Sequence, residues 1–157
     1  ELCRLILEKF ENIDAIAGVA TGAIAQGALI AEQLGLPYVY VRSAPKDHGL
    51  ENLIEGNLIP GQRVVVIEDL ISTGGSSLKA VEAIRNVGCE VVGMAAIFSY
   101  RFPVAEERFK AANVDVVTLS NYEAVLEAAL KTGYITEEDL ETLKEWRKDP
   151  ASWNVNK

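Results

Sequence analysis

The chain has 157 residues, of which 49% are hydrophobic and 24% charged, the composition of an ordinary globular protein with one core. It carries 15 Lys and Arg against 23 Asp and Glu, and the net charge of −8 argues against a general binder of nucleic acid or of anionic membranes. Cys3 and Cys89 lie far apart without metal-site spacing, which favours a reducing, cytoplasmic location over a disulfide framework. We expect a single domain over residues 1–157.

The first third of the chain alternates between helix and strand patterns. Glu1–Phe10 has helical spacing, Ala15–Gly18 is a short apolar strand, and Ile24–Leu34 is a second helix. Tyr38–Arg42 is rich in β-forming residues. Residues 43–61 turn polar, with prolines and glycines, which predicts a long loop or a loose hairpin. A loop of this length is usually a lid or binding loop, with a disordered connection as the alternative.

Apolar strands alternate with helices in the rest of the chain as well. Arg63–Ile67 and Glu90–Phe98 are nearly continuous apolar runs, typical of strands buried on both faces of a parallel sheet. The other predicted elements are a strand at Val114–Leu119 and helices at Ser77–Val87, Pro103–Ala112, Tyr122–Lys131 and Glu137–Arg147. The alternation predicts an α/β fold with a parallel β-sheet flanked by helices on both faces. Ligands of such sheets bind beyond the carboxyl ends of the strands.

The most informative stretch is Val64–Ser77, VVVIEDLISTGGSS. A buried strand delivers Glu68 and Asp69 at its carboxyl end, and a short turn then begins a helix. The residues of this turn suit an anion; they are Ser72, Thr73, Gly74, Gly75 and Ser76. Glycines let backbone N–H groups approach a phosphate, hydroxyls add donors, and the helix N-terminus contributes about half a positive charge. Consecutive carboxylates on an extended chain point in different directions, so they do not chelate one ion together.

This stretch resembles the phosphoribosyl-pyrophosphate (PRPP) signature of type I phosphoribosyltransferases. It contains neither GxxxxGK[ST] nor GxGxxG, the other common nucleotide motifs. The plainer alternative is a strand that ends in solvated acids before a capped helix. The resemblance implies that Ser72–Ser76 bind the 5-phosphate of PRPP while Glu68 and Asp69 orient its ribose hydroxyls. It also implies Mg²⁺, held mainly by PRPP, with a contact through water to Glu68 or Asp69.

Within this family, Val41–Gly56 (VRSAPKDHGLENLIEG) is similar to the long mobile catalytic loop of the orotate phosphoribosyltransferases, and the likeness continues to EWRKDPASW. It implies that Arg42, Lys46 and His48 bind pyrophosphate oxygens, and that Lys46 and His48 serve the neighbouring subunit of a homodimer. The residues agree in charge, because three potential cations lie close together, opposed only by Asp47. Taken singly, His48 on a polar loop is more typical of a surface residue, Lys46 of a solvated charge, and Arg42 of a partner for a nearby carboxylate.

The chain departs from the family pattern at two of these positions. Ser43 follows Arg42 where many orotate enzymes carry a second Lys. Gly22 stands where some members carry a Lys, so backbone N–H groups at Thr21 and Gly22 are expected to bind pyrophosphate. An ordinary strand-to-helix turn is the alternative there.

Base recognition is the least supported part of the resemblance. Arg101 lies where the family sometimes has an arginine for the orotate carboxylate, but its SYRFP context matches poorly and fits a surface arginine equally well. Nothing in the chain matches the base-covering segment that family members carry before the opening helix. We therefore expect that an upstream N-terminal segment is absent from these 157 residues.

The resemblance implies a glycosyltransferase of pyrimidine biosynthesis that converts orotate and PRPP into orotidine 5′-phosphate and pyrophosphate. A purine phosphoribosyltransferase would share the PRPP loop, but the KDHG sequence disfavours it. The alternative outside enzymes is a PRPP-sensing regulator that has lost catalysis. Lys46 and His48, together with the lack of a basic extension, argue against that regulator.

Overall fold

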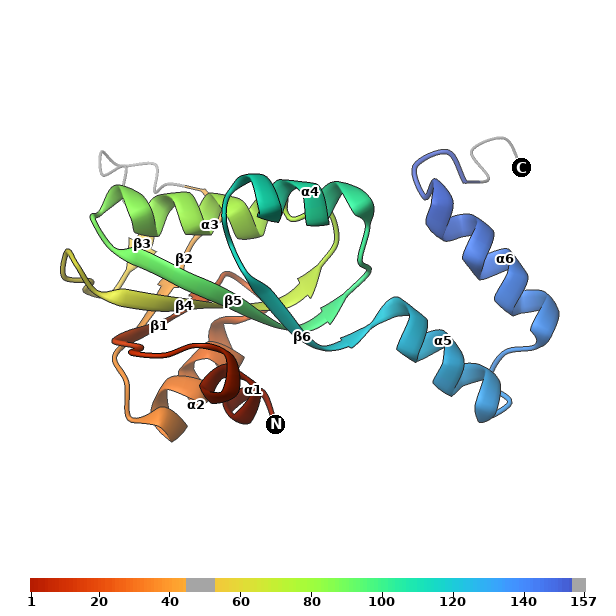
Figure 1. The fold of residues 1–157 in the computed structure, drawn as a ribbon, viewed down its shortest axis with the longest axis horizontal. Helices are drawn as coiled ribbons and strands as arrows, with labels where there is room; N and C mark the ends of the chain where they lie inside the picture. The colour runs from red at the N-terminus through yellow and green to blue at the C-terminus, as the bar shows by residue number, and fades with distance from the viewer. Residues whose placement is uncertain (45–52, 154–157) are drawn as a thin grey trace. The chain divides into compact units, whose positions relative to one another are not determined.

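The computed structural model describes residues 1–44 and 53–153, and Figure 1 shows its elements. Six strands form one sheet in the order β3-β2-β1-β4-β5-β6. The strands are β1 Ala15–Val19, β2 Tyr38–Val41, β3 Ile54–Glu55, β4 Arg63–Ile71, β5 Glu90–Ser99 and β6 Val116–Asn121. The helices are α1 Leu2–Lys9, α2 Ile24–Leu34, α3 Gly75–Asn86, α4 Pro103–Ala111, α5 Tyr122–Lys131 and α6 Glu137–Lys148. Strands β1, β2, β4 and β5 pair in parallel.

Helices cover both faces of the sheet, with α1 and α2 on one face and α3 and α4 on the other (Figure 1). Successive residues of β4 point to opposite faces and supply both cores. Val64 and Val66 pack with side chains of α3 and α4, whereas Val65 and Ile67 pack with those of α1 and α2. Burial of one such side chain stabilises the fold by about 1.5–3 kcal/mol. The predicted α/β fold, flanked on both faces, is confirmed.

The end of β4 differs from the prediction. The strand continues to Ile71 instead of ending at Ile67, because Leu70 and Ile71 pair with Phe98 and Ser99 of β5. The predicted strand end before the acidic pair is therefore wrong, and both carboxylates project from within the sheet.

Two further departures flank this strand. Helix α3 begins at Gly75 and not at the predicted Ser77. In the predicted loop over residues 43–61, Ile54 and Glu55 form β3, which pairs antiparallel with β2. The described part of this segment thus fits the predicted loose hairpin, and β3 forms an antiparallel edge beside the parallel strands β2, β1, β4 and β5.

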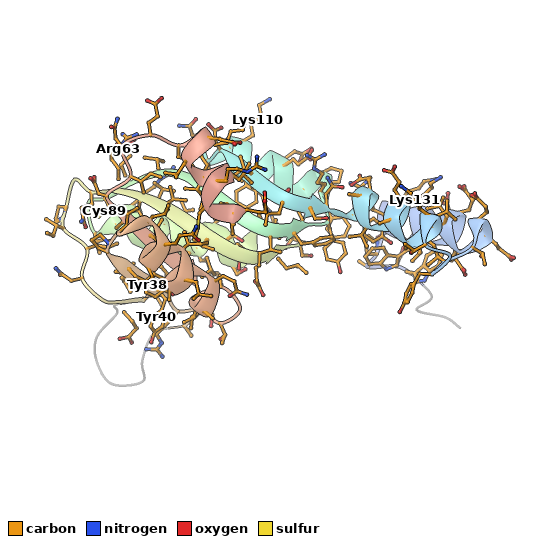
Figure 2. All side chains as sticks on the ribbon, turned by 90° about the horizontal axis from the view of Figure 1, so that it is seen from below. Tyr38, Tyr40, Arg63, Cys89, Lys110 and Lys131 are labelled. Atoms are coloured by element: carbon orange, nitrogen blue, oxygen red, sulfur yellow. The ribbon has the colours of Figure 1, made fainter. Side chains whose placement is uncertain are left out.

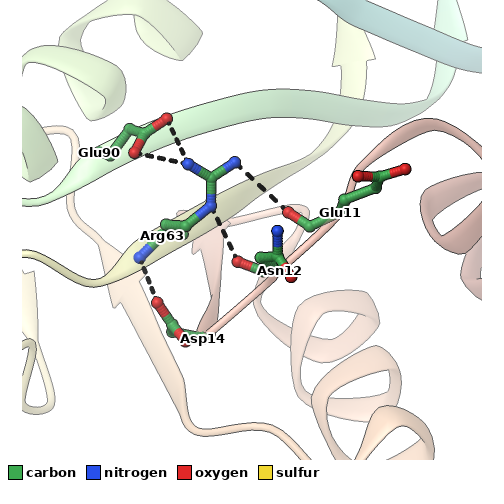
Figure 3. Close-up of polar contacts among 5 residues, drawn as sticks. All are labelled: Glu11, Asn12, Asp14, Arg63 and Glu90. Atoms are coloured by element: carbon green, nitrogen blue, oxygen red, sulfur yellow. Dashed lines mark hydrogen bonds and ion pairs between the residues drawn. The ribbon is translucent and has the colours of Figure 1, made fainter.

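The amino end of the sheet is held together by Arg63, the first residue of β4 (Figure 3). Its Nη1 donates to both carboxylate oxygens of Glu90, at 2.8 and 2.7 Å, and its Nε donates to the Asn12 carbonyl at 3.0 Å. Its backbone N–H donates to Asp14 Oδ2 at 2.8 Å. Cys89, which is free and buried, lies at the same end of the sheet (Figure 2). These contacts join β4 and β5 to the segment before β1, at the end of β4 opposite to the loop that follows it.

The chain divides into two compact units, residues 1–119 and residues 120–157. In the second unit, the Tyr122 hydroxyl of α5 donates to the Leu143 carbonyl of α6 at 3.3 Å. The Tyr122 ring also contacts the Trp146 ring, with 5.3 Å between centroids. None of the helices within the described ranges has the length and apolar character that a membrane crossing requires.

Candidate active site

The loop between β4 and α3 has the backbone geometry of an anion site. Gly74 has a φ of +77°, in the left-handed region that favours glycine, and it precedes the first helical residue, Gly75. The first N–H groups of an α-helix have no acceptor within the helix, and they carry a partial positive charge. Because α3 begins earlier than predicted, the N–H groups of Gly75 and Ser76 belong to this set. The loop is therefore suited to a phosphate monoester.

Helix α4 holds this loop from the side. The Arg108 Nη1 donates to the Thr73 carbonyl at 3.0 Å. A Cβ atom on Gly74 would lie only 3.0 Å from Cε2 of Phe109, so glycine permits the close approach of this ring. Sequence reasoning missed Arg108 and Phe109, because only tertiary packing places α4 beside the loop.

The two carboxylates of the acidic pair have different surroundings. Glu68 is only 4% exposed, and its Oε2 accepts from the Ser77 hydroxyl at 2.8 Å. Burial raises the pKa of Glu68 to about 7, although the hydrogen bond from Ser77 acts in the opposite direction. Asp69 is half-buried, and its carboxylate lies against Gly22 in the turn after β1, since a Cβ on Gly22 would overlap it. The side chains point to different partners, as the alternation along a strand predicts.

The turn after β1 is shaped by Tyr38 of β2. Its hydroxyl donates to the Ile24 carbonyl in the first turn of α2 at 2.7 Å. A Cβ on Gly18 or on Gly27 would approach Tyr38 within 2.7–2.8 Å, so both glycines make room for its ring. Figure 2 labels Tyr38 and Tyr40, which lie two residues apart on this strand. Tyr38 thus fixes the start of α2 and, with it, the exposed Thr21–Gly22 turn.

The phosphate loop, the turn after β1 and Arg42 lie close together where the strand order of the sheet reverses. Strand β1 lies between β2 and β4, so the turn after β1 and the loop after β4 are neighbours at one edge. A small cavity of about 130 Å³ lies here, lined by Val19, Ala20, Val41, Arg42, Ser43, Ser76, Lys79 and Ala80. Open α/β sheets bind ligands at such a reversal. Lys79, one helical turn after Ser76, was not predicted, and it adds a second cation to the cavity.

Arg42 is only partly available in this arrangement. Its Nη1 lies 3.5 Å from Oε1 of Glu55 on β3, and its backbone N–H donates to the Leu53 carbonyl at 2.8 Å. An incoming anion would compete with Glu55 for this guanidinium. The ion-paired alternative noted for Arg42 is thus present in the structure.

Arg101 lies apart from these residues. It lines a separate cavity of about 520 Å³, which also includes Ser99, Lys9, Lys110 and Phe109 among its walls. The Arg101 backbone has a φ of +51°, and its N–H donates to the Ser99 hydroxyl at 3.0 Å. The two cavities share no lining residue.

The comparisons with known proteins agree with this geometry. A phosphoribosyl transferase domain matches residues 2–132. The orotate phosphoribosyltransferase of Phocaeicola vulgatus is 73% identical over 157 residues, which is 100% of this chain and 74% of the relative. That of Porphyromonas gingivalis is 65% identical over 155 residues, 99% of this chain and 74% of the relative.

The chain belongs to the orotate phosphoribosyltransferases.

Solved structures of this family have the same fold. Orotate phosphoribosyltransferase from Aeropyrum pernix has a TM-score of 0.72 and 31% identity, covering 86% of this chain and 76% of that one. The Mycobacterium tuberculosis enzyme in complex with PRPP has a TM-score of 0.65 and 31% identity, covering 78% of this chain and 72% of that one. The predicted family, fold and enzyme class are confirmed.

The roles of individual residues in this orotate phosphoribosyltransferase stay predictions. Lys46 and His48 lie outside the described residues, as does half of the predicted catalytic loop. Within residues 1–44 and 53–153, no group of three or more His, Cys, Asp or Glu side chains is placed to hold a metal ion.

Proposed function

We propose that the chain transfers the 5-phosphoribosyl group of PRPP to orotate, giving orotidine 5′-phosphate and pyrophosphate, as a cytoplasmic enzyme of pyrimidine biosynthesis. The observation that carries this proposal is the convergence of the phosphate loop, the Thr21–Gly22 turn, Asp69 and Arg42 at one edge of the sheet. The identity with named orotate phosphoribosyltransferases supports orotate as the acceptor.

The proposed reaction exchanges one bond at the anomeric carbon of the ribose. The bond to the pyrophosphate oxygen breaks, a bond to a ring nitrogen of orotate forms, and that nitrogen loses its proton. Positive charge develops on the ribose in such displacements. The protein then contributes position and electrostatic stabilisation.

Each described residue group has a distinct part in this proposal. Ser72–Ser76 bind the 5-phosphate, and Asp69 orients the ribose hydroxyls. Glu68, for which the resemblance implied the same role, is instead buried against Ser77. The Thr21–Gly22 turn and Arg42 bind the pyrophosphate. Arg101 is assigned to the orotate carboxylate on the resemblance alone, because it lines the other cavity. Bound Mg²⁺ would neutralise phosphate charge, with a water-mediated contact to Asp69 fitting its position.

The resemblance supplies the remaining parts. Lys46 and His48 are proposed to neutralise the leaving pyrophosphate in the partner subunit of a homodimer. We also propose that residues 1–157 act as one phosphoribosyltransferase domain, including helix α6, which lies beyond the matched residues 2–132.

An assay of pyrophosphate release from PRPP tests the proposal. With Mg²⁺ present, orotate should support release, whereas adenine and hypoxanthine should not. A Ser72→Ala, Thr73→Ala and Ser76→Ala triple variant loses three hydrogen bonds to a charged phosphate, each worth about 1.5–3 kcal/mol, so PRPP affinity should fall at least about tenfold. Release with a purine alone would favour a purine enzyme. PRPP binding without release for any base would favour the regulator.

A further inference from the structure

Ser77 makes a buried contact that no predicted role uses. It lies in the first turn of α3, after the last residue of the phosphate loop, and it is only 1% exposed. Its hydroxyl donates to Oε2 of Glu68, which lies nine positions earlier on β4, at 2.8 Å. The contact therefore ties the strand before the loop to the helix after it.

Glu68 also contacts the residue that follows it, Asp69. Its other carboxylate oxygen, Oε1, accepts from the backbone N–H of Asp69 at 3.2 Å. The carboxylate of Asp69 in turn lies against Gly22, beside the turn assigned to pyrophosphate. A chain of contacts thus runs from Ser77 through Glu68 to Asp69, and it connects the helix that presents the phosphate loop with the acid that faces the ribose.

The glutamate side chain gives this contact its importance. Three rotatable bonds separate its backbone from its carboxylate, and a buried polar group that loses its partner is costly and tends to rearrange. An alanine at position 77 would leave Oε2 without this donor and release the carboxylate from its position. An aspartate at position 68 is one methylene shorter, so it would not reach the Ser77 hydroxyl.

We propose that Ser77 is a positioning residue for the transfer reaction. It holds the Glu68 carboxylate and thereby fixes the position of Asp69 relative to the bound 5-phosphate. The inference rests on the proposed function of this site. Ser77 itself touches no substrate in this account. Its loss should therefore impair the handling of the ribose more than the binding of a phosphate group.

A double-mutant cycle in PRPP affinity and turnover tests this role. Ser77→Ala should lower kcat/KM for PRPP about tenfold, while the affinity for inorganic phosphate, measured by calorimetry, changes less than about twofold. In a Glu68→Asp background, the same Ser77→Ala change should cost less than about twofold, because the contact is already broken. Thermal unfolding of all four proteins shows that each is folded.

Two results would overturn the role. An equal loss from Ser77→Ala in both backgrounds would show that Ser77 does not act through Glu68. A parallel loss of inorganic phosphate affinity would show that Ser77 merely supports the loop. If Ser77→Ala does not fold, Ser77→Cys, of similar shape with a weaker donor, replaces it in the cycle. Failure of the wild type to release pyrophosphate would contradict the proposed function, while the PRPP affinities would still test Ser77.

Discussion

The contact between Asp69 and Gly22 joins the two segments that form the site. One belongs to β4 and the other to the turn after β1, and a Cβ on Gly22 would overlap the carboxylate of Asp69. That carboxylate is the end of a side chain, which a new methyl group can push aside, whereas a backbone clash would disrupt the fold. The absence of a side chain at position 22 thus serves the position of Asp69 and not the stability of the turn.

We therefore expect Gly22→Ala to separate activity from stability. The methyl group displaces the Asp69 carboxylate, so kcat/KM for PRPP should fall by about tenfold or more, since misplacement of a positioning group by about 1 Å has effects of this size. The midpoint of thermal unfolding should stay close to the wild-type value. A matching loss of thermal stability would contradict this interpretation, as would unchanged kinetics.

Glu68 makes the free energy of unfolding depend on pH. Burial raises its pKa to about 7 in the folded state, compared with 4.5 for an ordinary glutamate. Between these values the folded protein holds a proton that the unfolded chain releases, so a rise in pH favours unfolding. The Glu68 contribution is most favourable below this window and is lost as the pH rises through the folded pKa.

The neutral variant Glu68→Gln should lack this pH dependence. From about pH 5 to about pH 8, its free energy of unfolding should rise relative to wild type by about 2–3 kcal/mol, since one pKa unit corresponds to about 1.4 kcal/mol. Urea denaturation at several pH values measures the difference between the two proteins and cancels the groups that they share. Parallel curves across this range would mean that Glu68 is already ionised in the folded protein.

For single residues, the sequence predicts the chemical role of a side chain better than it predicts the burial and the neighbours of that side chain. The order of serines and glycines predicts an anion loop, and strand alternation predicts that the acidic side chains diverge. The burial of Glu68 is not predictable in this way, because it depends on how closely α3 packs against β4. The contributions of Arg108 and Lys79 have the same cause, since each reaches the site only through the packing of its helix.

For whole helices and strands, the interiors were predictable, whereas the ends of most elements differ by one or more residues, including β6, which is Val116–Asn121 instead of Val114–Leu119. Local spacing predicts α2 at Ile24–Leu34 and α5 at Tyr122–Lys131, and the structure has both with the same bounds. The end of β4 was misplaced because two consecutive acids are locally unfavourable in a strand. Pairing with β5 carries the strand past them, and this long-range contact leaves no local signal.

Arg63, at the other end of the same strand, allows a test of what stabilises the sheet. Arg63→Met removes hydrogen bonds to the carbonyl of Asn12 and to the Glu90 carboxylate, where the partly exposed ion pair itself contributes little. The free energy of unfolding should fall by about 1–2 kcal/mol. The value of kcat/KM should not change, because the substitution lies at the amino end of the sheet. Chemical denaturation and steady-state kinetics measure the two effects.

A surface variant serves as the matched control for Arg63. Lys144 pairs with Glu141 on one exposed face of α6, and such pairs contribute less than about 1 kcal/mol. Lys144→Met should therefore leave stability nearly unchanged. If Arg63→Met were equally silent, the contacts in Figure 3 would not stabilise the sheet. A loss of kcat/KM at constant stability would mean that this end of the sheet affects the site.

At the scale of the whole molecule, the described residues account for one part of the site. They include the proposed phosphate loop, Asp69, the turn after β1 and Arg42, whereas Lys46 and His48, the proposed pyrophosphate cations, lie outside the described residues. In the proposed homodimer, Asp69 acts in its own subunit and Lys46 acts in the neighbouring one. Each complete site then requires two chains.

This arrangement predicts that two inactive variants restore each other. Asp69→Ala and Lys46→Ala should each have little activity alone. In a mixed dimer one site carries both substitutions and the other carries neither, and random exchange makes about half of the dimers mixed, so roughly a quarter of wild-type activity should return. Native mass spectrometry of mass-labelled variants confirms that subunits have exchanged. If they exchange and activity stays at the level of the separate variants, Lys46 acts within its own subunit and the shared site is wrong.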